Sequence, residues 1–249
     1  MARLLFLSAP EASREEPVKR APVTAVLGVA LATAVSVPLS VRDAAATSQH
    51  FCTANISPCP TGDLYGIDIN AADRLSGTLS GSAILHTNLG DIDCMASTFG
   101  AQSNSDTSSS SITSLAFSGT SMTTPCTTTF FGSPTATFTV NNLPYGFTVV
   151  LSGACQGGAT GCDGTFTVNN LNLSIKLSNG LICSATGSPV ANFYNKGNVH
   201  SPHPQTTAIE FRNAPITMGG GLCPSSATYS AVYSLTGTNP AGTDVYLTT

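Results

Sequence analysis

Charged side chains are scarce in this sequence. Only 9% of its 249 residues are charged, against about 25% in an average soluble protein. The formal net charge is −4, and no segment gathers the basic side chains that bind a phosphate backbone. We therefore expect no nucleic acid among the partners of this protein.

Tryptophan is absent, and the residues that build long helices are not abundant. A coiled coil or a helical repeat would need Ala, Glu, Lys, Leu and Arg in bulk, so the composition excludes both. Hydrophobic residues nevertheless make up 41% of the chain. That share is enough to form a buried core, and it argues against wholesale disorder.

The few basic residues are concentrated near the start of the chain. Lys19 and Arg20 precede an apolar stretch over residues 21–41, and three alanines follow at 44–46. A positive segment, an apolar segment and a small-residue cleavage site together are typical of a secretory signal peptide. We therefore predict a signal peptide over residues 1–46.

Two alternatives accompany this prediction. The acidic residues within 1–17 do not suit a signal peptide, so the true start of the protein could lie near Val18. The apolar stretch is also close to the length that spans a bilayer, which makes a transmembrane anchor the competing interpretation. With the signal removed, residues 47–249 would form a secreted domain that keeps no stable membrane span.

Cysteine is the main candidate for stabilising such a domain. An even number of cysteines behind an export signal predicts a disulfide framework. None of them has the C-x-x-C spacing of a zinc site, although about a hundred pairings remain open by counting alone. The eight residues are Cys52, Cys59, Cys94, Cys126, Cys155, Cys162, Cys183 and Cys223.

Spacing narrows the choice of partners. Two pairs flank short turns and should close local loops, and the other four belong to a strand–turn–cysteine pattern that occurs in both halves of the chain. The expected pairs are Cys52–Cys59, Cys155–Cys162, Cys94–Cys126 and Cys183–Cys223. The repeated pattern predicts an internal duplication, although Ser/Thr-rich strands also resemble one another by composition alone.

Apolar residues alternate with polar ones along much of the chain, for example over residues 171–177 and 229–235. This period of two is typical of half-buried strands, and turn residues recur at short intervals. We therefore predict an all-β fold, an antiparallel β-sandwich of ten to twelve Ser/Thr-rich strands. Two subdomains that meet near residue 160 are the alternative, and residues 195–205 should form a loop.

The sequence offers little for metal or cofactor chemistry. His200 and His203 lie three residues apart in a predicted loop, but a transition-metal site needs three or four ligands. Five aspartates cluster loosely without the spacing of a known calcium loop. We expect neither a metal nor a cofactor; the aspartates are Asp63, Asp68, Asp73, Asp91 and Asp93.

No catalytic residue stands out either. A glycosidase needs two carboxyl groups beside a cleft, but Glu210 is the only glutamate after residue 46. The G-x-S-x-G sequence of a nucleophile elbow is also missing. A secreted hydrolase therefore remains an alternative without a nominated site.

The layout of residues 94–235 resembles a group of small secreted β-rich proteins from actinobacteria. The shared features are a strand that ends in cysteine (IDCMASTFG), an L-P-aromatic segment (LPYGF), a second cysteine strand (LICSATGSP) and a final aromatic strand (TYSAVYSL). The resemblance implies secretion and an all-β fold, and it implies no activity.

The sequence thus predicts a secreted or cell-envelope protein of structural or interaction type, with an extracellular or cell-surface partner that it does not identify. The alternatives are the hydrolase and a β-sandwich that binds a small apolar or carbohydrate ligand. An interaction protein should carry an exposed apolar patch. A carrier should instead enclose an apolar cavity of about 300 Å³ or more.

Overall fold

The computed structural model describes residues 50–52, 74–102, 110–121, 123–151, 154–238 and 241–248. Residues 44–249 form one compact unit, whereas the predicted signal peptide lies outside the described residues. No α-helix occurs in the described ranges, and none of their segments is a helix long and apolar enough to cross a membrane.

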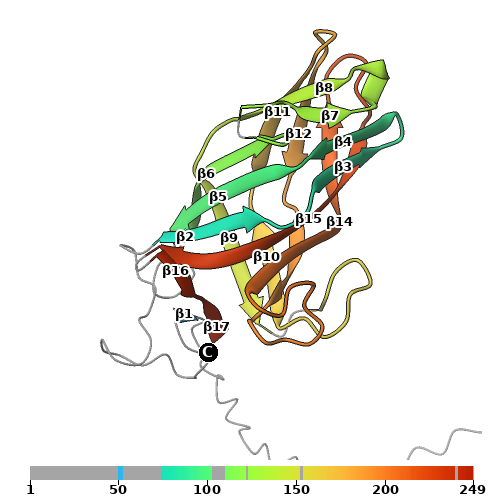
Figure 1. The fold of residues 1–249 in the computed structure, drawn as a ribbon. Helices are drawn as coiled ribbons and strands as arrows, with labels where there is room; N and C mark the ends of the chain where they lie inside the picture. The colour runs from blue at the N-terminus through green and yellow to red at the C-terminus, as the bar shows by residue number, and fades with distance from the viewer. Residues whose placement is uncertain are drawn as a thin grey trace, which may run out of the picture. The chain divides into compact units, whose positions relative to one another are not determined.

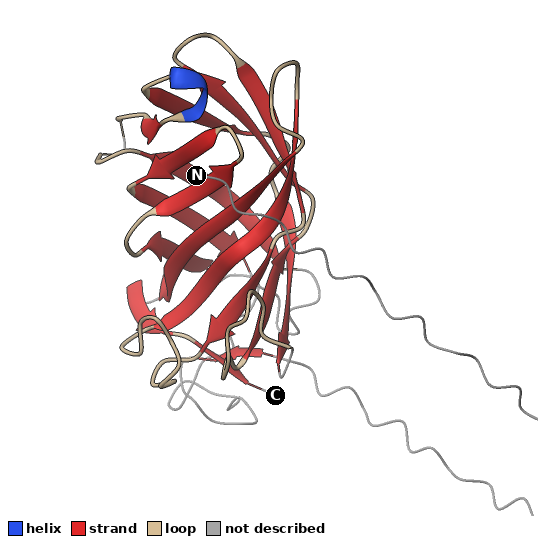
Figure 2. Cartoon of the chain, turned by 90° about the vertical axis from the view of Figure 1, so that its right-hand side faces the viewer, coloured by secondary structure: helices blue, strands red, loops and turns tan. Residues whose placement is uncertain are grey.

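Seventeen strands and one 3-10 turn make up the described fold (Figures 1 and 2). They are β1 (His50–Cys52), β2 (Arg74–Leu79), β3 (Ala83–Thr87), β4 (Gly90–Cys94), β5 (Ala96–Gln102), β6 (Ser111–Ser118), β7 (Cys126–Thr128), η1 (Phe130–Gly132), β8 (Thr135–Val140), β9 (Tyr145–Leu151), β10 (Gly164–Val168), β11 (Leu171–Leu177), β12 (Ile182–Gly187), β13 (Val190–Tyr194), β14 (Thr207–Gly219), β15 (Ser226–Thr238), β16 (Ala241–Asp244) and β17 (Tyr246–Thr248).

Most of these strands join end to end into eight long antiparallel strands. The pairs β2–β3, β4–β5, β6–β7, β8–β9, β10–β11 and β12–β13 each continue across a short interruption, and β14 and β15 are unbroken. Each long strand pairs with the next one along the chain, and β15 returns to pair with both β2 and β3. The sheet therefore closes on itself.

The predicted all-β, antiparallel and disulfide-linked fold is confirmed. The sheet forms two facing walls around one core, as in a sandwich, but the walls are joined at both edges. The expected count of ten to twelve strands was wrong, because short interruptions divide six of the eight long strands and because β1, β16 and β17 add three more. Strands on the two sides of residue 160 pair directly, as Leu151 of β9 does with Gly164 of β10.

The core lies inside the closed sheet, because alternate residues of each strand point inward. In β11 the residues from Leu171 to Leu177 alternate between buried and more exposed positions. Aromatic rings from opposite walls meet in the middle of the core. The ring centroids of Phe99 (β5) and Phe166 (β10) lie 6.4 Å apart. Gly77 of β2 makes room there, because a Cβ atom at this position would overlap the ring of Phe99.

Both ends of the closed sheet are covered by aromatic side chains. At one end, β1 pairs with β17. This pairing places the ring centroid of Phe51 6.4 Å from that of Phe147 and 6.1 Å from that of Phe193. At the other end, η1 buries Phe130 completely. Buried aromatic rings therefore lie at both ends of the core.

The side wall has two intervals without ladder pairing. One separates residues 187–191, at the junction of β12 and β13, from residues 211–216 of β14, and the other lies between β6 and β8. The β6–β9 ladder ends at the pair Ile112–Tyr145, and the β7–β8 ladder begins at the pair Cys126–Ala136. No strand pairing joins the residues between these points in the described structure. We call this interval the seam; it comprises residues 113–118 of β6 and 137–140 of β8.

The described residues contain three disulfides, one between two strands, one that closes a loop and one between a strand and a loop. They join Cys94 to Cys126, Cys155 to Cys162, and Cys183 to Cys223. These are the pairs expected from spacing. Cys52 is buried in β1, and its expected partner Cys59 lies outside the described residues.

Candidate functional site

An apolar cavity of about 60 Å³ lies inside the closed sheet. Its surface is almost entirely apolar, and both walls contribute to it. The volume is several times the roughly 10–15 Å³ that one water molecule needs. The lining residues are Ala83, Leu85, Ile92, Cys94, Phe99, Ile112, Leu115, Phe117, Phe138, Phe166, Val168, Leu171, Leu173, Ala185, Pro189, Phe211, Ile216, Tyr229 and Tyr233.

The cavity does not reach the volume of about 300 Å³ that we expected of a carrier, which is where the pockets that enclose drug-sized ligands begin. It arises because β-branched, aromatic and small side chains meet around it and do not fill the space. Ala83 and Ala185 contribute little volume between the rings of Phe99, Phe166 and Phe211. An apolar space of this kind, without polar partners for water, suits a small apolar molecule.

A chain of three hydroxyl groups crosses the core beside the cavity. The Tyr229 hydroxyl lies 2.7 Å from that of Tyr233, which lies 2.8 Å from Ser97 Oγ. Ser97 Oγ donates to the backbone carbonyl of Ala116 at 2.8 Å. Since a carbonyl can only accept, Tyr233 must donate to Ser97 and Tyr229 must donate to Tyr233.

This order uses all three hydroxyl protons within the protein. Burial, together with the electrostatic interaction and the hydrogen bond with Tyr233, raises the pKa of Tyr229 well above its ordinary value. Burial also raises the pKa of Tyr233, so both side chains stay neutral over the physiological range. The three hydroxyl groups therefore have no proton left to donate to a ligand. The site favours ligands that do not need to accept a hydrogen bond from the protein.

A second group of polar residues surrounds Glu210, on the outer face of β13 and β14. The carboxylate of Glu210 accepts hydrogen bonds from Tyr194 (3.0 Å), Asn192 (3.3 Å) and Arg212 (2.8 Å). Asn192 also bonds to the backbone of Gln156, which lies in the loop closed by Cys155–Cys162. Glu210 is 7% exposed.

These four residues (Asn192, Tyr194, Glu210 and Arg212), which we call the Glu210 group, hold the loop closed by Cys155–Cys162 against the sheet. Burial and the hydrogen bond to Glu210 raise the pKa of Tyr194 to about 12. Gly157 permits close contact with the sheet, because a Cβ atom there would overlap the backbone and side chain of Arg212. Each carboxylate oxygen of Glu210 accepts a hydrogen bond from a protein group, as buried polar groups generally do. These contacts are sufficient to explain Glu210 as a residue that stabilises the fold.

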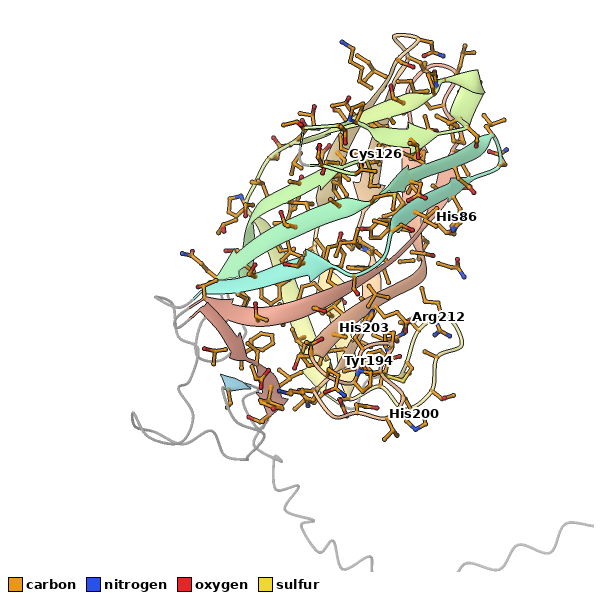
Figure 3. All side chains as sticks on the ribbon, in the orientation of Figure 1. His86, Cys126, Tyr194, His200, His203 and Arg212 are labelled. Carbon is orange, nitrogen blue, oxygen red and sulfur yellow. A yellow bond between two sulfur atoms is a disulfide. The ribbon has the colours of Figure 1, made fainter. Side chains whose placement is uncertain are left out.

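His200 and His203, the two histidines that the sequence sets three residues apart, both lie in the loop between β13 and β14. His200 is exposed and packs beside Gly161, and His203 is partly buried. Figure 3 shows both histidines toward the same end of the fold as Tyr194 and Arg212, with His86 farther along. No group of three or more His, Cys, Asp or Glu side chains comes together among the described residues.

Two of the five aspartates singled out in the sequence, Asp91 and Asp93, lie in the described structure. Asp91 forms a partly exposed pair with His86, with Oδ1 3.2 Å from Nδ1. The pairing of β3 with β4 sets these two residues opposite each other. Asp93 has one buried carboxylate oxygen without a hydrogen-bond partner. Asp63, Asp68 and Asp73 lie outside the described residues.

Sequence reasoning did not locate the cavity, its hydroxyl chain or the Glu210 group. The alternation in β15 did place Tyr229 and Tyr233 on one inward face. The partners Ser97 and Ala116 come from β5 and β6, however, so the chain of hydroxyls depends on how distant strands meet. The pairing of Asn192 with Glu210 likewise requires the register of β13 against β14.

Comparison with known proteins adds no assignment, because no protein family, curated protein or solved structure matches this chain.

Proposed function

We propose that this protein is exported and binds a small, uncharged apolar molecule inside its closed sheet. The apolar cavity between the two walls is the observation that carries the proposal. Closed antiparallel sheets of eight strands have an interior just wide enough to be filled by side chains or to hold one small ligand. The cavity lies where such a ligand would bind.

The lining residues favour a compact ligand over an extended one. A cavity of about 60 Å³ leaves no room for a long acyl chain or a sugar. The cavity is also smaller than the engineered apolar cavity of about 150 Å³ that holds benzene, so a ligand of one ring must displace lining side chains as it binds. It would then contact the faces and edges of the surrounding rings. The hydroxyl chain beside the cavity has already used its protons, which disfavours a ligand that must accept a hydrogen bond.

Binding of fluorobenzene by the purified protein tests this proposal. We expect fluorine NMR to show a bound signal and the melting temperature to rise with ligand concentration, because a ligand that binds only the folded state stabilises it. Ala185→Leu should abolish both effects by filling the cavity, and Ala185→Val should weaken them. Ala159→Leu, in the Cys155–Cys162 loop, is the matched control that should bind normally. Absence of binding to the unaltered protein would overturn the proposal.

Export rests on other features. Residues 1–46 contain the pattern of a signal peptide, the described domain carries three disulfides, and disulfides persist in oxidising compartments. The resemblance to secreted actinobacterial proteins agrees with this proposal. Fractionation of producing cells should yield a mature protein that starts near Thr47 outside the cytoplasm. An intact N-terminus with free thiols in the cytoplasm would contradict export.

One further feature favours an interaction function as the second candidate. Ile182 is 58% exposed and Leu222 is 73% exposed, and they flank the Cys183–Cys223 disulfide. Exposed apolar side chains at one place can mark a contact surface. An Ile182→Ser/Leu222→Ser double variant should leave fluorobenzene binding unchanged and remove any binding to the surface of producing cells.

A further inference from the structure

We infer that the seam between β6 and β8 is the mouth of the internal cavity, and that it admits flat aromatic molecules past the rings of Phe117 and Phe138. The inference rests on the proposed ligand-binding function and adds the route of access and the chemical class of the ligand.

Solvent exposure of the lining residues points to the seam. Most of the residues that line the cavity are buried, and the four that are only partly buried are Leu115, Phe117, Phe138 and Tyr229. Three of these four belong to the seam. The fourth, Tyr229, lies behind Phe117, with the two ring centroids 6.4 Å apart. The cavity therefore comes nearest to solvent between β6 and β8.

The backbone explains why this part of the wall can open. The strands on the two sides of the seam share no ladder pairing in the described structure. A second unpaired interval separates residues 187–191 from β14, but the lining residues beside it, Pro189, Phe211 and Ile216, are buried. A register shift in β6, opposite Gly100 and Ala101, turns Leu115 and Phe117 inward after Ile112. Such bulges bend a strand and end its pairing on one side.

Two aromatic rings close the seam in place of backbone hydrogen bonds. Phe117 and Phe138 lie 4.9 Å apart between ring centroids, with an interplanar angle of 38°. Phe117 and Phe138 are only partly buried, so their rings can change rotamer without breaking a ladder, whereas ladder hydrogen bonds break only with local unfolding. Displacement of these rings is therefore the least costly way to open the wall.

The same rings favour an aromatic ligand. A flat ring can pass between two rings and then stack on them, and aromatic contacts add roughly 0.5–1.5 kcal/mol beyond simple burial, which corresponds to about a two- to tenfold change in affinity. Fluorobenzene should therefore bind about two- to tenfold more tightly than fluorocyclohexane, a probe of similar size without a π-system.

The test measures exchange rates of fluorobenzene by fluorine NMR in matched variants. Phe138→Leu and Phe117→Leu should each raise the rates of binding and release by roughly tenfold, because they weaken the ring pair at the mouth. Phe211→Leu makes the same change at a lining residue on β14, away from the seam. It should alter affinity while leaving the association rate within about twofold of the unaltered protein.

The possible outcomes separate the two proposals. If fluorobenzene binds and all three variants exchange at the same rate, the seam is not the mouth, although the internal site stands. If fluorocyclohexane binds as tightly as fluorobenzene, the aromatic ligand class is wrong. If neither probe binds the unaltered protein or Phe211→Leu, the proposed function itself fails. Circular dichroism of each variant establishes that it is folded, and the two seam variants serve as replicates of each other.

Discussion

The wall formed by β14 and β15 differs from the wall formed by β6 and β8. The first pair consists of two unbroken strands of 13 residues each, and their ladder runs from Thr207–Leu235 to Thr217–Ser226 with one bulge. The second pair runs side by side without a ladder in the described structure. One wall is held by backbone hydrogen bonds and the other by side-chain packing.

This difference shows how a closed sheet can be stable and still admit a ligand. A ladder opens only when several hydrogen bonds break together, so β14 and β15 hold the shape of the fold. Packing between two rings can be undone by rotation of single side chains. We therefore expect stability to depend chiefly on the continuous wall and ligand exchange to depend on the seam.

Truncation of one phenylalanine in each wall should give the largest contrast. Phe211→Ala removes a ring that is 7% exposed and should cost about 3–5 kcal/mol of the free energy of unfolding. Phe138→Ala removes a partly exposed ring and should cost about 1–2 kcal/mol. Chemical denaturation of both variants measures the difference. Equal losses would show that the seam carries as much packing energy as the continuous wall.

Removal of single disulfides should separate stability from exchange. Cys94–Cys126 and Cys183–Cys223 span 32 and 40 residues, so each should contribute about 4 kcal/mol by chain entropy. Cys126 pairs with Ala136 at one end of the seam. The Cys94→Ala/Cys126→Ala variant should therefore also speed fluorobenzene exchange.

The Cys183→Ala/Cys223→Ala variant is the control for that prediction, because its disulfide lies beside β14 and β15. It should lose similar stability without a change in exchange rate. An equal acceleration in both variants would mean that general loosening, and not the seam, governs exchange.

The raised pKa of Tyr194 predicts that the free energy of unfolding falls at alkaline pH. The pKa of Tyr194 is raised to about 12 by burial and by Glu210, against about 10 in an unfolded chain. The stabilisation that the neutral Tyr194 hydroxyl gives the folded state is fully present below pH 10, and it is lost as the pH rises from about 10 through 12. A shift of this size corresponds to about 2–3 kcal/mol.

Tyr194→Phe should therefore make the free energy of unfolding less sensitive to pH over that interval. The phenolate absorbance of the folded protein should also lose a component that titrates near pH 12. The chain contains no tryptophan, so tyrosine ionisation can be followed directly in the near ultraviolet. An unchanged titration curve in the variant would contradict the assignment.

Much of the fold was predictable from local patterns. The alternation over residues 171–177 and 229–235 identified β11 and β15, and the loop expected over residues 195–205 lies between β13 and β14. Cysteine spacing gave the three pairs that the described structure contains. These features depend on neighbouring residues, which a sequence displays directly.

The candidate site was less accessible to such reasoning. The cavity depends on the volume left between side chains of ten strands, and no local pattern encodes that volume. The spacing of Ile112, Leu115 and Phe117 does mark the bulge in β6, because a regular strand would place its inward residues two apart. That irregular spacing was the one local sign of the seam.

The smallest expected effect concerns two asparagines with positive φ, one in each wall. Asn142 (φ 59°) lies at the corner between β8 and β9, next to the seam, and Asn213 (φ 51°) lies at the bulge in β14. Replacement of either by Ala should cost about 1 kcal/mol, because a Cβ-bearing residue without a short polar side chain disfavours this conformation.

Replacement by Gly should distinguish the two positions. Asn213 Oδ1 accepts a hydrogen bond from Ser230 Oγ at 3.2 Å, so Asn213→Gly relieves the backbone but loses that contact across the ladder. Asn142 is exposed, and its role is to turn the chain, so Asn142→Gly should stay within about 0.5 kcal/mol of the unaltered protein. Urea midpoints of the four variants measure these differences. A loss at Asn142→Gly as large as at Asn142→Ala would mean that the Asn142 side chain, and not its backbone conformation, maintains the corner that ends the seam.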